Sequence, residues 1–163
     1  LINGLKDETL ETRIAAIQAL GMIQYKPAVK PMSDLIQKTD TETERLSATI
    51  SLGMIGDKSA IPSLERLLED EQANIRWDAA IALAKMGEKS GAYIIEGLLD
   101  REYLNQFKQV DPVEQNRVLM VAINTASILF DKRFEGKLNF LSVNDQDLSI
   151  RDAAIKALEK NYN

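Results

Sequence analysis

Five arginines recur along the chain at similar intervals, and each follows an acidic residue by five or six positions. Successive arginines lie 32, 31, 41 and 34 residues apart, and the pairs are Asp7 with Arg13, Asp40 with Arg45, Asp70 with Arg76, Asp111 with Arg117, and Asp145 with Arg151. A guanidinium group can hold a carboxylate or a phosphate through two parallel hydrogen bonds, so the row could bind a ligand. It could equally join neighbouring structural units by ion pairs. Because every unit shares the pair, we interpret the row as a structural ladder.

The residue types in this chain give little support for catalysis. The chain has no histidine and no cysteine, which removes Ser-His-Asp and Cys-His arrangements and the usual structural zinc sites. Asp145 and Asp147 begin like a calcium loop, but the glycine and the distal glutamate that such a loop needs are missing. We therefore expect a non-enzymatic protein with no catalytic residue, no metal and no cofactor.

The sequences that begin at the five arginines are similar to one another, which indicates a repeat. They are RIAAIQALG, RLSATISLG, RWDAAIALA, RVLMVAINT and RDAAIKALE. A period in this range is typical of stacked helical units. In the third unit, helical spacing predicts a first helix over 72–86, stopped by Gly87, and a second over 91–99. Small residues recur three positions after four of the arginines and let neighbouring helices approach closely.

Helix starts are also marked. Asp111, Pro112 and Glu114 predict an N-cap, first turn and third position of a helix. Thr41 and Glu44 have the spacing of a capping box, in which each side chain bonds the other residue's main chain.

Two sequence patterns resemble bacterial HEAT repeats of the phycobilisome-lyase-like class: D-x5-R-x2-A-A-x-A-L-G and I-G-D-K-S-A-I-P-x-L-x-x-L-L. The resemblance covers nearly the whole chain, is closest over 40–100, and weakens in the fourth unit, where Asn124 replaces a leucine. It implies an all-α, right-handed α-solenoid of antiparallel helix pairs, with the first helices on the convex side and the second helices on the concave side. Bilin lyases, which load a chromophore onto an antenna protein, carry similar repeats.

The 163 residues suit one HEAT-repeat domain over 1–163, with about four helix pairs and partial units at both ends. We expect repeats over 7–38, 39–69, 70–100 and 101–142, flanked by partial units over 1–6 and 143–163. Because LINGLKD at the start matches the ends of later repeats, we expect a fragment of a longer chain.

A formal net charge of −5 and a pI near 4.9 argue against nucleic-acid binding, which needs clustered lysine and arginine. No apolar run approaches the roughly 18 residues of a membrane span, so we expect no membrane insertion. The compartment stays open: the cytoplasm is favoured, and an upstream signal peptide is compatible with the sequence.

Aligned second helices leave several residues outside the core, and these are candidates for a binding surface: Tyr93, Glu65, Glu96 and Arg66. The alternatives are a Tyr93 ring folded over a neighbouring helix and a solvated glutamate face. The long step before Arg117 adds an insertion over 101–110, which contributes the candidates Arg101, Tyr103 and Lys108. Its apolar residues could instead pack over residues 118–121, which we favour for Leu104 and Phe107.

We therefore predict a non-enzymatic scaffold that binds a protein or peptide through the concave face and the 101–110 insertion. Two alternatives remain: an accessory subunit of a bilin-lyase-like enzyme, and a regulatory domain of a larger protein.

Overall fold

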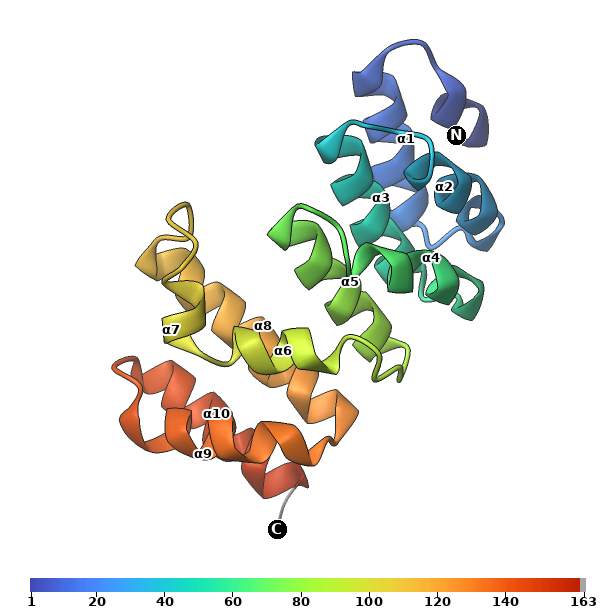
Figure 1. The fold of residues 1–163 in the computed structure, drawn as a ribbon. Helices are drawn as coiled ribbons and strands as arrows, with labels where there is room; N and C mark the ends of the chain where they lie inside the picture. Colours follow the sequence, from blue (N-terminus) through green and yellow to red (C-terminus); the bar gives the residue numbers. More distant parts are fainter. Residues whose placement is uncertain (162–163) are drawn as a thin grey trace. The chain divides into compact units, whose positions relative to one another are not determined.

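The computed structural model describes residues 1–161, which contain helices and 3-10 turns and no strand (Figure 1). The chain forms two compact units, Leu1–Gly91 and residues 92 onward. The boundary falls inside the predicted third repeat, and the expectation of one domain over 1–163 stays a prediction.

The first unit holds five α-helices and three 3-10 turns, in the order η1 (Ile2–Lys6), α1 (Leu10–Met22), η2 (Lys26–Ala28), α2 (Val29–Ile36), α3 (Glu42–Ile55), η3 (Lys58–Ala60), α4 (Ile61–Leu67) and α5 (Ala73–Lys85). The first helices α1, α3 and α5 pack side by side in chain order, α2 packs on α3, and α4 packs on α5. Apolar residues at helical spacing on these faces, such as Ile17, Leu52 and Leu83, are fully buried.

Glycine allows the first helices to approach each other closely. A Cβ on Gly21 of α1 would lie 2.6 Å from Ser51 Oγ of α3, and one on Gly53 would lie 2.8 Å from the Cβ of Ala82 in α5. No heavy atom fits at those distances, so both positions need glycine for the observed packing.

The second unit contains α6 (Ala92–Leu98), α7 (Arg101–Leu104), α8 (Pro112–Leu129), η4 (Lys132–Phe134), α9 (Glu135–Asn144) and α10 (Leu148–Asn161). Helix α8 packs on α6 and α10, and α9 runs beside α10, as Figure 1 shows in orange and red. Phe134 and Leu138 are fully buried in this core. The short helix α7 comes from the inserted segment, and its Leu104 is fully buried.

The two helices predicted over 72–86 and 91–99 are confirmed as α5 and α6. Gly87, at φ +86°, follows the end of α5, in the left-handed region that glycine adopts without strain. Asp111 caps α8 by accepting the Glu114 N–H at 2.8 Å, with Pro112 in the first turn. The all-helical architecture of stacked helices agrees with the predicted α-solenoid.

The predicted capping box at Thr41 and Glu44 is wrong. Thr41 precedes α3 with an extended backbone but makes no side-chain cap hydrogen bond. The Glu44 carboxylate is almost fully buried and accepts instead from Arg13 and Thr39. A nearby guanidinium competes for that carboxylate better than a main-chain N–H does.

Candidate functional site

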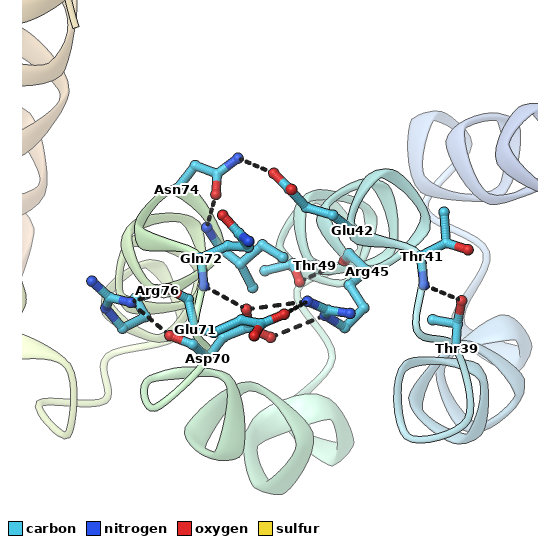
Figure 2. A network of polar contacts seen from close by, with 11 residues as sticks. Thr39, Thr41, Glu42, Arg45, Thr49, Asp70, Glu71, Gln72, Asn74 and Arg76 are labelled. Atoms are coloured by element: carbon cyan, nitrogen blue, oxygen red, sulfur yellow. Dashed lines mark hydrogen bonds and ion pairs between the residues drawn. The ribbon is translucent and has the colours of Figure 1, made fainter. Parts of the chain in front are cut away.

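The six-residue spacing between aspartate and arginine has a structural cause, which Figure 2 shows around Asp70. The Asp70 carboxylate accepts the N–H of Gln72 at 2.9 Å, which forms the turn before α5, and accepts Nε of Arg45 at 3.0 Å from α3. Arg76, six residues on, donates to the Asp70 carbonyl oxygen at 2.6 Å. One aspartate is thus held by an arginine of the preceding repeat through its side chain and by the arginine of its own repeat through its main chain.

Asp145 repeats this arrangement in the second unit. It accepts Nε of Arg101 at 2.7 Å, Nη2 of Arg101 at 2.8 Å and the N–H of Asp147 at 2.9 Å. Arg151 donates to the Asp145 carbonyl oxygen at 2.6 Å. The pairs Arg13–Glu44, Arg45–Asp70 and Arg101–Asp145 together form what we call the arginine ladder.

Arg117, which sequence spacing placed in the ladder, lies elsewhere. Its side chain is 73% exposed and donates at 3.0 Å to Glu114 of its own helix. Arg101 takes the ladder position because the inserted segment brings it to Asp145, and its Nη2 also donates to Asn116 at 2.7 Å. The Arg101 guanidinium is thus engaged within the second unit, and its expected role in binding a partner stays a prediction.

In the second repeat, different residues form the same contact of the arginine ladder. Asp40 is exposed, whereas Thr39, six residues before Arg45, accepts the Thr41 N–H at 3.2 Å and donates to Glu44. Glu44 then supplies the carboxylate for Nε of Arg13 at 2.5 Å. Sequence spacing alone could not predict this exchange, because the carboxylate has moved by one helical turn.

Burial and pairing oppose each other in the pKa of these buried carboxyl groups. Burial of Asp145 raises its pKa, but the hydrogen bond from Arg101, the Asp147 N–H and the positive charge outweigh burial, so the pKa lies below its ordinary 3.8. Burial of Glu44 likewise raises its pKa, and the hydrogen bonds from Arg13 and Thr39 lower it below 4.5. Both groups are therefore ionised at neutral pH and act as structural charges.

A groove of about 670 Å³ lies in the second unit between α6 with its following turn and α9. The buried side chains of Leu99 and Leu141 contribute to its apolar lining. The Phe140 ring also lines it and is 63% exposed. At Gly136 on the α9 wall, an added Cβ would meet nothing within 4 Å.

The three cations that line this groove, which we call the α6–α9 groove, are already paired. Arg101 pairs with Asp145, Lys137 with Asp100, and Arg133 with Asp131. Two carboxylates in the lining, Glu96 and Glu102, form no ion pair within the described residues.

A groove of about 700 Å³ occupies the corresponding place in the first unit, between η1 and α2. The ladder pair Arg13–Glu44 lies in its lining, as Arg101–Asp145 lies in the other. Here Lys30 pairs with Asp34 along α2, while Lys6 and Lys38 have no ion pair within residues 1–161. The two grooves therefore share a place in the repeat but differ in free charge.

The other candidates from the sequence are spread over both units. Glu65 and Arg66 are exposed on α4, Tyr93 is 50% exposed on α6, and Lys108 is exposed in the inserted segment. Of the second-helix candidates in the second unit, Glu96 lies in the α6–α9 groove.

The inserted segment packs onto α6. The Tyr103 ring lies 3.4 Å from where a Gly97 Cβ would stand and meets Phe107 edge to face, with ring centroids 5.2 Å apart.

Phe140 was not identified as a candidate from the sequence. It follows the buried Leu138 by two positions, as Arg66 follows Leu64, so extending the aligned rows to the fourth repeat would have found it.

Two searches for other kinds of site give negative results within the described residues. No group of three or more His, Cys, Asp or Glu side chains there could hold a metal ion. No helix over residues 1–161 combines the length and apolar character needed to cross a bilayer.

Comparisons with known proteins add to this geometry. Residues 35–106 match the family model of HEAT repeats. Among solved structures, the chain is similar to the complex of CpcE and CpcF of phycocyanin lyase from Nostoc sp. PCC7120, with a TM-score of 0.74 and 21% sequence identity. The alignment covers 99% of this chain and 63% of that chain, and at this identity it shows the fold alone. No curated protein matches the chain.

Proposed function

We propose that this chain, a HEAT-repeat protein, is a non-catalytic scaffold that binds a protein or peptide segment in the α6–α9 groove. The observation that carries the proposal is the Phe140 ring, 63% exposed in a groove whose lining includes the buried Leu99 and Leu141. Large exposed aromatic side chains next to apolar pockets are frequent anchors of protein interfaces.

The inserted segment supports the same surface. Its first residues, Arg101 and Glu102, contribute to the groove lining, while Tyr103 packs its ring against α6. The insertion thus shapes one wall of the groove, as expected of an insertion at the binding edge of a repeat protein.

A steric block tests the proposal. Gly136 lines the groove, and a side chain there meets open space, so Gly136→Trp should fill the groove without disturbing the core. The matched control is Val143→Trp, a change on the same helix at a 71% exposed residue that does not line the groove. We expect affinity capture from native lysate to recover a partner with the parent and with Val143→Trp, and to lose it with Gly136→Trp. Equal capture by both tryptophan variants would contradict this site.

A second candidate function rests on the structural similarity to a phycocyanin lyase complex. We propose as the alternative that the chain is an accessory subunit of such an enzyme, working with a protein partner. A bilin-induced change in visible absorbance that requires the chain, in a mixture with a catalytic lyase subunit, a bilin and an antenna protein, would support it. A spectrum that is the same with and without the chain would exclude it.

A further inference from the structure

The α6–α9 groove carries an unbalanced charge at its lining. Each of its cations already faces a carboxylate, through Arg101–Asp145, Lys137–Asp100 and Arg133–Asp131. Glu96 is half-buried on α6 and Glu102 is exposed on α7, and neither has an ion pair among the described residues. After pairing, the groove therefore presents two negative charges to any occupant.

An exposed ring accompanies those charges. The face of a phenylalanine ring carries negative quadrupole charge and attracts ammonium and guanidinium groups within roughly 6 Å. Phe140 lines the same groove as Glu96 and Glu102, so a cation there could find both a ring and a carboxylate. A lysine or arginine could meanwhile place its aliphatic stem against apolar surface such as Leu99 and Leu141.

The corresponding groove of the first unit has the opposite balance. Within residues 1–161, the cations of this groove that have no ion pair are Lys6 and Lys38, and the one carboxylate without an ion pair is Asp40. The negative balance therefore belongs to the α6–α9 groove and not to the repeat in general. The difference gives the second unit its own preference among partners.

Resting on the scaffold function above, we infer that the occupant of the α6–α9 groove is a protein segment that combines lysine or arginine with apolar side chains. Glu96 and Glu102 select its positive charge, and Phe140 anchors it. The apolar lining gives affinity, whereas the two carboxylates decide which segment is accepted.

Fluorescence anisotropy with defined peptides tests the inference on the full chain. The probe is a labelled synthetic peptide in which lysine and arginine alternate with leucine and phenylalanine. Two matched peptides carry glutamate or glutamine at every basic position. We expect the basic peptide to bind, the glutamate peptide not to bind, and the affinity of the basic peptide to fall as salt rises.

Charge variants then locate the effect. The double change Glu96→Gln, Glu102→Gln should weaken binding of the basic peptide by roughly tenfold, since each pair is partly exposed to water. The control Glu8→Gln, Glu11→Gln alters the net charge equally at exposed residues of the first unit and should leave binding unchanged. Equal effects of the two double variants, or tighter binding of the glutamate or glutamine peptide, would overturn the inference.

The steric variant separates this inference from the function on which it rests. If Gly136→Trp abolishes binding of a peptide while Glu96→Gln, Glu102→Gln does not weaken it, the groove is a binding site but its charge selection is refuted. If Gly136→Trp binds the basic peptide as the parent does, the groove is not the site and both proposals fail.

Discussion

Replacing Arg101 by methionine should destabilise the second unit more than any other single arginine change in it. The Asp145 side chain is 1% exposed and its partner Arg101 is 19% exposed. Removing one partner of a buried ion pair costs about 3–5 kcal/mol, because the remaining charge stays buried without compensation. Since Arg101 retains some contact with water, we expect Arg101→Met to lower the free energy of unfolding by about 2–3 kcal/mol.

Urea unfolding followed by far-ultraviolet circular dichroism measures this change, and Arg117→Met provides the matched control. Arg117 is exposed, and its ion pair among the described residues lies within its own helix, so its loss should cost no more than about 0.5 kcal/mol. Adding Asp145→Asn to Arg101→Met removes the buried charge and retains an oxygen for the Asp147 N–H, so the double variant should regain about 1 kcal/mol. If Arg101→Met were as mild as Arg117→Met, the arginine ladder would not hold the repeats together.

The same pair predicts a dependence on pH. The pKa of Asp145 in the folded protein lies below its ordinary 3.8. Burial raises this pKa, but the hydrogen bond from Arg101, the N–H of Asp147 and the positive charge of Arg101 together lower it by more. A depressed pKa stabilises the fold above about pH 3.8, and this stabilisation is lost as pH falls through that value towards the folded pKa. The gap in stability between the parent and Arg101→Met should therefore narrow in acid, and a gap that widened would contradict the ionic origin of the effect.

Three further outcomes are expected. Gly21→Ala should lower the free energy of unfolding in urea by about 1–3 kcal/mol, since its methyl group would clash with Ser51. The control Gly136→Ala should leave the free energy of unfolding unchanged or raise it by about 0.5 kcal/mol, and equal effects of the two changes would contradict the close helix approach. Burial raises the pKa of Asp78 to about 6, so the ionised carboxylate destabilises the fold above that pH and has no such effect below about pH 3.8. Asp78→Asn should therefore raise the free energy of unfolding by about 1–2 kcal/mol at neutral pH but not in acid, and thermal unfolding at several pH values measures this difference. Phe140→Ala should weaken peptide anisotropy binding by roughly tenfold with stability unchanged, and unchanged binding would exclude Phe140 as an anchor.

The repeat architecture was predictable because it is written in local signals that each repeat restates. Helical spacing, the stop at Gly87 and the cap at Asp111 each act within a few residues, so their interpretation needed no knowledge of distant contacts. Residues 35–106 match the family model of HEAT repeats for the same reason, since the sequence pattern of these repeats consists of such local signals.

The proposed binding surface was less predictable, because it depends on contacts between repeats. Arg101 replaces Arg117 in the ladder only because an inserted segment folds back to Asp145, and no spacing rule encodes that return. The place of Tyr103 depends on the bare surface at Gly97, and the importance of Phe140 depends on which neighbouring cations are already paired. Pairing decides the charge that a groove presents, and pairing is visible only in three dimensions.

Nuclear magnetic resonance titration of the isotopically labelled chain with the basic–apolar peptide tests the central claim most directly. The account predicts that the amide signals of residues 96–102 and 136–144, on both walls of the α6–α9 groove, shift together and saturate with one affinity. Shifts confined to the first unit, or small shifts scattered over exposed carboxylates of the whole chain, would contradict a binding groove between α6 and α9.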